Sequence, residues 1–369
     1  MIVVTGAYGM VGWALCDVLA QGCRSWRIVA RCETGAGDAA DERVVADVTA
    51  AEEVARALRG ATAVIHLAGV APGMKPARAD HEVAAMRALV TAASGEKVER
   101  FIFLSASGAS PQSPHAWSRA KGEAEALLRA SALPATILRA GFVFSAQSRA
   151  LVALVQLVRG GAKLRLPLLR AGRQFPIAAG DVAIALATAL DHHQMAGRTL
   201  ELGVAPDLTL ERLLELVAQR LGRPLELSRL PFTGVPLADA LAQVPGAELT
   251  DAESWTSRFA IAEVPDLREY QQALPMRRVD FVDELRTYPF GAAPPRPGDP
   301  LPVVQSRDDA ERGVGLPLFI PGEQLRGAGG VPGRIAARFG RVDPFGRIEA
   351  TDDPTRAPPP SKDDDETAR

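Results

Sequence analysis

Three glycines at regular spacing, Gly6, Gly9 and Gly12, separate two apolar segments of the sequence. Residues 2–4 are a β-branched run that predicts a buried strand, and residues 13–19 repeat apolar side chains at helical spacing. Glycine lets the backbone turn out of the strand, approach a ligand and bring the helix against the strand. The N-terminus of the helix adds free N–H groups and a positive dipole. The segment therefore predicts a cradle for the pyrophosphate of a dinucleotide.

An ordinary strand, turn and helix is the alternative interpretation, because glycine triplets alone are a weak signal. If the segment is a phosphate cradle, its backbone contacts the cofactor along most of its length. The expected contacts are Thr5, Gly6, Tyr8, Gly9, Met10, Val11 and Gly12.

Apolar segments alternate between strand and helix patterns along the first half of the chain. Beyond the first strand, strands are expected at residues 26–30, 43–46, 63–67, 98–104 and 135–139, with helices between them. This alternation predicts an α/β fold built on a parallel, doubly wound Rossmann sheet. The 369 residues, of which 47% are hydrophobic, are enough for one large or two modest domains.

Charge and cysteine content exclude several classes of partner. The net charge of −2 provides no basic field and argues against nucleic acid. Cys16, Cys23 and Cys32 have neither metal-ligand spacing nor a disulfide pattern, so we expect no metal and a cytoplasmic location. The sequence opens without a signal-type segment and has no apolar run long enough to span a bilayer. We expect a soluble protein, or at most a peripherally membrane-bound one.

The residue that follows the second strand bears on which dinucleotide is held. Proteins that select NAD usually carry an acid there for the ribose hydroxyls, whereas an arginine suits a 2′-phosphate. Here the strand ends in Arg31, and Glu33 lies two positions further on. The sequence therefore favours NADP(H), with NAD(H) as the alternative.

The end of the third strand carries the next expected contacts, Asp47 and Val48. A carboxylate there can accept a hydrogen bond from an adenine amino group. Asp47 or Thr49 can equally cap the helix that follows, and the two roles are compatible.

The fourth strand ends in Leu67, Ala68 and Gly69, small residues for the most part, where the backbone must pass close to a ribose. All three are expected cofactor contacts. We expect His66, inside the strand, to be a core histidine rather than a catalytic one.

Polar side chains that could take part in chemistry follow the fifth strand. Ser105 and Ser107 lie at its carboxyl end, where ligands bind in parallel sheets, so both hydroxyls are expected to face the cofactor crevice. The alternative is a serine-rich turn that caps the next element. Trp117 and Lys121 lie four residues apart on a predicted helix and therefore share one face.

Taken together, these motifs resemble the short-chain dehydrogenase/reductase superfamily, and more narrowly its extended and atypical NAD(P)H-binding branches. The resemblance covers residues 1–230 and rests on the glycine segment, residues 66–69, Ser107, the aromatic-x-x-x-lysine pair and residues 137–144. It implies that Ser107 and Lys121 are catalytic and that Lys121 also binds the nicotinamide ribose. It further implies that Ala140 and Phe142 contact the cofactor.

One position departs from the family pattern in a way that matters for mechanism. In the family a tyrosine four residues before the lysine is the general acid/base. Here that position is Trp117, whose indole N–H donates only and cannot shuttle a proton. His115 and Ser118 are nearby candidates for a substitute acid, and the family proline after Arg139 is replaced by Ala140. The resemblance therefore implies cofactor binding but not tyrosine-dependent carbonyl reduction.

Composition divides the chain into four expected parts. Residues 1–150 are expected to form the NAD(P)-binding Rossmann domain, and residues 151–289 the remainder of the sheet with a small substrate lid. Residues 290–350, rich in Pro and Gly, are expected to be an extended arm, and residues 351–369 a disordered tail. Residues 236–251, with a proline-glycine stop between two helical stretches, loosely resemble bacterial relatives of the Rossmann-folded accessory subunit of respiratory complex I.

Two classes of function follow from these observations. The first is an oxidoreductase or epimerase-type enzyme that uses NADP(H) on a small-molecule substrate without the usual tyrosine. The second is a non-catalytic NADPH-binding accessory or assembly subunit that joins a larger complex, such as complex I, through its arm. The expected lid and the strand-end serines favour the first class, whereas Trp117 and the arm favour the second.

Overall fold

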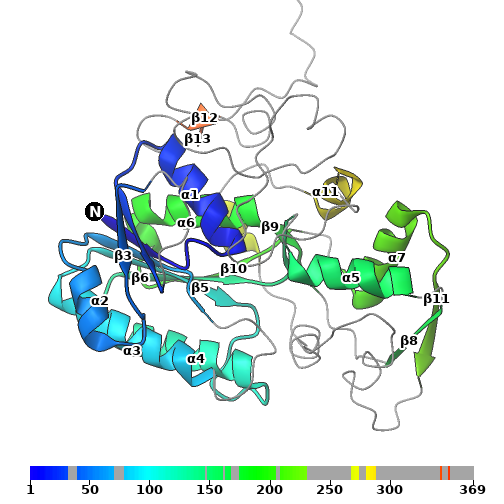
Figure 1. The fold of residues 1–369 in the computed structure, drawn as a ribbon, viewed down its shortest axis with the longest axis horizontal. Coiled ribbons are helices and arrows are strands. Elements are labelled where there is room, and N and C mark those ends of the chain that lie inside the picture. Colours follow the sequence, from blue (N-terminus) through cyan, green and yellow to red (C-terminus); the bar gives the residue numbers. More distant parts are fainter. Residues whose placement is uncertain are drawn as a thin grey trace, which may run out of the picture.

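The computed structural model has a parallel sheet at its centre, flanked by helices on both faces (Figure 1). The structure describes residues 1–31, 40–69, 79–145, 148–160, 163–167, 174–204, 208–230, 267–273, 280–287, 341–342 and 348–349. The main sheet has seven strands in the order β10-β6-β5-β4-β1-β2-β3. Their bounds are β1 (Ile2–Thr5), β2 (Trp26–Ala30), β3 (Glu42–Val45), β4 (Ala63–His66), β5 (Arg100–Ala106), β6 (Ala135–Ala140) and β10 (Thr199–Leu202).

Every pair of neighbouring strands in this sheet is parallel, and the order reverses where β1 separates β2 from β4. In sheets of this kind ligands bind outside the carboxyl ends of the strands at such a reversal. The predicted fold class, a doubly wound parallel α/β sheet, is confirmed. The glycine segment follows β1, so it lies at the expected place.

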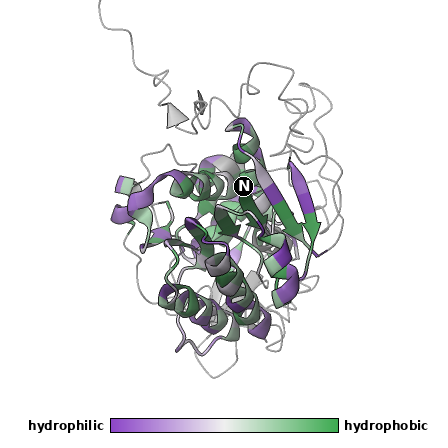
Figure 2. Ribbon diagram, turned by 90° about the vertical axis from the view of Figure 1, so that its left-hand side faces the viewer, coloured by the Kyte–Doolittle hydropathy of each residue, from purple (hydrophilic) through white to green (hydrophobic). Residues whose placement is uncertain are grey.

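Helices cover the two faces of the sheet because successive side chains of each strand point to opposite sides. The inner residues of β1 illustrate this. Val4 packs in the core beneath α1 (Met10–Gln21) and α6 (Ala179–Asp191), while Val3 packs in the core beneath the opposite helices. Those are α2 (Ala51–Ala57), α3 (Ala79–Gly95) and α4 (Ala116–Ala130). Figure 2 shows the green apolar strands inside and purple polar residues on the outer helix surfaces.

A second core lies beside the sheet and is built from α5 (Arg149–Gly160), α7 (Leu210–Leu221) and α11 (Phe281–Thr287) (Figure 1). Phe281 packs edge-on against Phe142 and Phe144, which ties this core to the end of the Rossmann sheet. The remaining elements are β7 (Val143–Phe144), β8 (Lys163–Pro167), β9 (Ile177–Ala178), a 3₁₀ turn (His193–Met195), β11 (Glu226–Leu230), α10 (Arg268–Ala273), β12 (Arg341–Val342) and β13 (Ile348–Glu349).

Two short parallel pairs, β7 with β9 and β8 with β11, were not among the strands expected from the sequence. They are only two to five residues long, so the periodicity signal in each is weak. Helix α6 begins at Ala179, and Asp181 lies buried within its first turn. The expected helices at residues 236–251, most of the arm and the tail lie outside the described residues, and the four-part division stays a prediction. None of the described helices is both long and apolar enough to cross a membrane.

Asp17 is a buried carboxyl on α1, and it provides a test of this packing. Gln21 Nε2 donates to Asp17 Oδ2 at 3.0 Å, whereas Asp17 Oδ1 has no hydrogen-bond partner among the described residues. Burial raises the pKa of this carboxyl from 3.8 to about 6. Between these values the folded chain keeps a proton that the unfolded chain releases, so the free energy of unfolding falls as pH rises.

Asp17→Asn is therefore expected to stabilise the protein above about pH 6, by on the order of 3 kcal/mol, because the amide cannot ionise. Thermal melts of both proteins across a pH series measure this. The wild type should lose Tm relative to the variant between about pH 4 and about pH 6. A difference in Tm that is constant over that range would contradict the assignment.

Candidate functional site

The glycine turn brings the ends of β1 and β4 into direct contact. Gly6 has a φ of +75°, a conformation that disfavours any side chain. A Cβ there would lie 2.4 Å from the backbone nitrogen of Ala68. A Cβ on Gly12 would lie 2.3 Å from the carbonyl oxygen of Gly6. Glycine is therefore required at both positions for the turn to close.

Gly9 differs from the other two glycines because its α-carbon is the least crowded of the three. It is exposed, and a Cβ there would meet only the carbonyl oxygen of Gly6, at 3.3 Å. The first hydrogen bond of α1 runs from Trp13 N–H to the Gly9 carbonyl, at 2.9 Å. The N–H groups of Met10 and Val11 precede that bond and so have no acceptor within the helix. This is the arrangement expected of an anion-binding turn.

The side chains of Thr5, His66 and Trp13 support the turn. Thr5 Oγ1 shares a hydrogen bond of 2.7 Å with His66 Nδ1 and accepts from the Ala68 N–H at 3.3 Å. Burial lowers the pKa of His66 to about 4, so its ring is neutral and structural, as expected from the sequence. The Tyr8 carbonyl accepts from the Trp13 indole at 3.1 Å, which orders the loop before α1.

Arg31 and Asp47 lie at the neighbouring ends of β2 and β3. Arg31 is exposed, directly after β2. The Asp47 carboxylate accepts from the Thr49 N–H and hydroxyl, both at 2.8 Å, and these bonds lower its pKa. The charges of Arg31 and His81 lower the pKa of Asp47 slightly further. Asp47 and Thr49 thus order the turn before α2, but the expected capping by either residue is wrong, since the N-cap residue of α2 is Ala50 and no side chain caps the helix. Val48 lies half-buried between them.

Lys121 forms a buried ion pair that the sequence did not predict. Its Nζ lies 2.6 Å from Glu82 Oε1 on α3, and the two side chains are 8% and 2% exposed. The ammonium also donates to the Leu104 carbonyl at 3.3 Å and lies 4.8 Å from the centre of the Phe103 ring. The pair lies beside Gly69, at the expected ribose position, because a Cβ on Gly69 would lie 2.9 Å from Glu82 Oε2.

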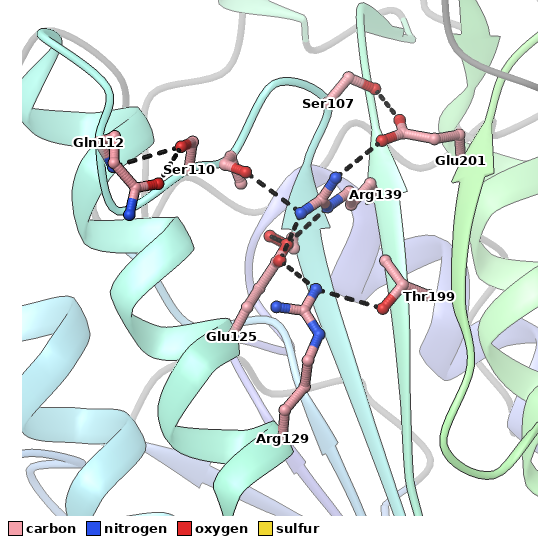
Figure 3. A network of polar contacts seen from close by, with 10 residues as sticks. Ser107, Ser110, Gln112, Glu125, Arg129, Arg139, Thr199 and Glu201 are labelled. Atoms are coloured by element: carbon pink, nitrogen blue, oxygen red, sulfur yellow. Dashed lines mark hydrogen bonds and ion pairs between the residues drawn. The ribbon is translucent and has the colours of Figure 1, made fainter.

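The two strand-end serines have different roles. Ser105 is buried and its hydroxyl donates to Glu125 Oε1 on α4 at 2.5 Å, so it points into the core rather than toward the crevice as expected. Ser107 lies beyond the end of β5, is half-buried, and donates to Glu201 Oε2 on β10 at 2.7 Å (Figure 3). Of the two serines, only Ser107 keeps a position where a ligand could reach it.

Arg139 joins these two carboxylates into one network (Figure 3). Its guanidinium lies 2.6 Å from Glu125 Oε2 and 3.2 Å from Glu201 Oε1. Hydrogen bonds to Glu125 raise the pKa of Arg139, so it stays charged. Glu125 is fully buried and is also bound by Arg129 at 2.6 Å.

Glu201 is the functional candidate that the sequence reading missed. Its side chain is 18% exposed, and burial raises the pKa of its carboxyl, while the hydrogen bond from Ser107 and the charge of Arg139 oppose that shift. A lone glutamate in a short strand gives no motif. The signal that could have pointed to Glu201 is its place between the buried Leu200 and Leu202. Because side chains alternate along a strand, Glu201 points to the opposite face of the sheet from these two leucines.

Three other expected site residues lie at the ends of β6 and α4. The carbonyl of Ala140 accepts from the Ser107 N–H at 3.0 Å, so its backbone borders the site. Phe142 is fully buried in the second core, which leaves its side chain away from any cofactor. Trp117, half-buried, lies in the first turn of α4, one turn before Lys121, and His115 is the N-cap residue just before that helix.

These residues fit a nicotinamide dinucleotide. The turn at Gly6 and Gly12 closes so tightly that a Cβ would fill it, and the exposed Gly9 precedes N–H groups suited to phosphate. Gly69 and the Lys121 pair lie at the adjacent strand end, on the same edge of the sheet. Within the described ranges, no group of three or more His, Cys, Asp or Glu side chains could hold a metal ion.

Comparison with solved structures gives the same fold. A nucleoside-diphosphate-sugar epimerase from Staphylococcus aureus is 18% identical with a TM-score of 0.62, over 77% of this chain and 99% of that one. MoeE5 in complex with UDP-glucose and NAD is 18% identical with a TM-score of 0.59, over 78% and 96%. WbmG from Bordetella bronchiseptica, in complex with NAD and UDP, is 17% identical with a TM-score of 0.58, over 77% and 91%.

Identities this low establish the fold but not the reaction. No curated protein matches the sequence of this chain. The model of the NAD(P)H-binding family matches residues 6–193, which is 188 of the 369 residues and includes the glycine turn from Gly6 onward, Arg31, Lys121 and the Ser107 network up to Arg139. The chain therefore belongs to the NAD(P)H-binding family, with the Rossmann fold of the sugar epimerases and of the short-chain dehydrogenase/reductase superfamily.

Proposed function

We propose that the protein is an NADP(H)-dependent oxidoreductase or epimerase-type enzyme whose proton route passes through Ser107 instead of a tyrosine. The observation that carries this proposal is the 2.7 Å hydrogen bond from the Ser107 hydroxyl to Glu201 at the carboxyl end of the sheet. The bound nicotinamide would supply or accept the hydride. Two neighbours in fold are bound to UDP or UDP-glucose, which makes nucleotide sugars the first substrates to test.

A serine bonded to a carboxylate can move a proton that Trp117 cannot. In the oxidising direction Ser107 accepts the proton of a substrate hydroxyl and passes its own to Glu201. Arg139 keeps Glu201 ionised and oriented. Because burial raises the pKa of Glu201, turnover should rise with pH through a value above the ordinary 4.5 of a glutamate.

The non-catalytic accessory subunit is the second candidate. It is favoured by Trp117 at the position of the family tyrosine and by the commitment of Lys121 to Glu82. One experiment separates the two. The purified protein is denatured to identify any released nucleotide, and in parallel the native protein is mixed with UDP-glucose while nicotinamide absorbance is followed. A retained nucleotide that no substrate oxidises or reduces would favour the accessory role.

Arg31→Ala tests the preference for NADP(H). If the guanidinium binds the 2′-phosphate, the variant should lose about 10-fold or more in affinity for NADPH, as for a charged hydrogen bond, and little for NADH. Fluorescence titration of both nucleotides measures this. Arg56→Ala, which removes an exposed arginine from α2, is the matched control and should change neither affinity. Equal wild-type affinity for NADPH and NADH would overturn the preference.

A further inference from the structure

We propose that Glu82 binds the hydroxyls of the ribose next to the nicotinamide, as the hydrogen-bond acceptor that complements Lys121. The proposal rests on the proposed function only in that the protein holds a nicotinamide dinucleotide. Glu82 belongs neither to the glycine motif nor to the aromatic-x-x-x-lysine pair, so its role does not follow from either.

The first argument comes from the cost of the buried pair. Glu82 and Lys121 are almost completely removed from water, and their head groups lie 2.6 Å apart. Removing two charges from water costs about as much as their attraction returns, so such a pair adds little to stability compared with apolar side chains of similar size. Here it lies next to the neutral His66 ring and the Phe103 ring, in the apolar core. A role beyond stability accounts for it better.

The second argument comes from Gly69, which opens onto the pair. Gly69 itself is exposed, although the head groups behind it are buried. A Cβ on Gly69 would lie 2.9 Å from Glu82 Oε2 and 3.2 Å from Lys121 Nζ. The volume in front of the Gly69 α-carbon therefore lies within reach of one acceptor and one donor. The carboxylate is the nearer of the two.

The third argument comes from the chemistry of a ribose diol. Each hydroxyl both donates and accepts, whereas an ammonium only donates. Lys121 can satisfy hydroxyl oxygens but cannot accept their protons. The Glu82 carboxylate supplies that acceptor on the same side of Gly69. Together the two head groups match a vicinal diol, and neither does so alone.

The test isolates the ribose by comparing two nucleotides that differ by it. ADP carries the adenosine and both phosphates, and ADP-ribose adds only the second ribose. Calorimetric titration of wild type and Glu82→Gln with ADP, ADP-ribose and NADPH gives the contribution of that ribose. We expect Glu82→Gln to lower the affinity for ADP-ribose and for NADPH by about 10- to 100-fold, as for a charged hydrogen bond, and to leave the affinity for ADP unchanged.

The matched control is Asp191→Asn, which also removes a carboxylate paired to a cation, here Arg24 at 2.6 Å, but at the last residue of α6 and outside the site. It should leave all three affinities unchanged. Glu82→Leu/Lys121→Met is the second variant, because replacing both partners leaves no unpaired charge and so preserves the fold if Glu82→Gln does not. It should also lose the gain in affinity from ADP to ADP-ribose.

Each outcome decides the matter. A selective loss for ADP-ribose and NADPH supports the proposal. Unchanged affinities in the Glu82 variants, or an equal loss for ADP, overturn it while leaving the proposed function intact. A wild-type protein that binds none of ADP, ADP-ribose and NADPH overturns the proposed function, and this proposal with it.

Discussion

Gly9→Val is expected to abolish nucleotide binding and to leave the fold intact. The variant places a branched side chain at the least crowded of the three glycines of the turn. That position lies in front of the first N–H groups of α1, where a pyrophosphate would bind. Protein neighbours oppose the side chain only slightly, since a Cβ would meet only the Gly6 carbonyl oxygen, at 3.3 Å, which would have to shift by a few tenths of an ångström. Fluorescence titration with NADPH, together with a thermal melt, measures both effects.

Gly12→Ala is the control for this interpretation, because it should have the opposite profile. Its Cβ would lie within 2.4 Å of two backbone oxygens, those of Gly6 and Ala7, so the turn itself must move and Tm should fall. If Gly9→Val were to bind NADPH with wild-type affinity, the phosphate site would have to lie elsewhere on the sheet.

Ser107→Ala is expected to lower turnover by about 10²- to 10⁴-fold with little change in NADPH affinity, as for the loss of a positioned proton-transfer group. The hydroxyl is the only atom removed, and its one recorded bond runs to Glu201. Stopped-flow absorbance with the best nucleotide sugar gives kcat, and titration gives the affinity. Ser110→Ala, which removes a hydroxyl from the following loop, is the matched control.

Trp117→Phe distinguishes this route from one that runs through the indole. The variant keeps an aromatic ring in the first turn of α4 but removes its only polar atom, so turnover should stay within about twofold of the wild type. A loss as large as that of Ser107→Ala would show that turnover needs the hydrogen bond that the indole N–H donates. Full activity in Ser107→Ala would remove Ser107 from the catalytic map and, with it, the role proposed for Glu201.

Much of the architecture could be predicted because it depends on local signals. The glycine turn could be predicted from the spacing of its glycines. Gly12 is required by backbone contacts within the turn, and Gly6 by its contact with Ala68 at the end of β4. The strands β1, β2, β4, β5 and β6 follow from largely apolar runs of four to seven residues, whereas β3 and β10 mix polar and apolar residues. The role expected of Lys121 is of a different kind, because it rests on the resemblance to the family and stays a prediction.

The partners of these residues could not be predicted, because they come from distant parts of the chain. Glu82 reaches Lys121 across 39 residues, and Glu201 reaches Ser107 across 94. No periodicity links such positions, and only the strand order brings them together. The orientation of Ser105 was wrong for a related reason: strand alternation alone does not reveal that the carboxylate of Glu125 lies beneath it.

The Arg139 network also limits how this chain can diverge. Two carboxylates, Glu125 and Glu201, and two guanidinium groups, Arg129 and Arg139, balance one another between α4, β6 and β10. Arg139 is the member that contacts both carboxylates, so its loss leaves Glu201 without this cation and Glu125 with only the half-exposed Arg129. Removing one partner of a buried ion pair costs about 3–5 kcal/mol, which is a large part of the total stability of a typical domain. Descendants of this sequence should therefore keep these positions as a block or replace them as a block, so that their covariation, rather than any one residue, marks proteins with the same site.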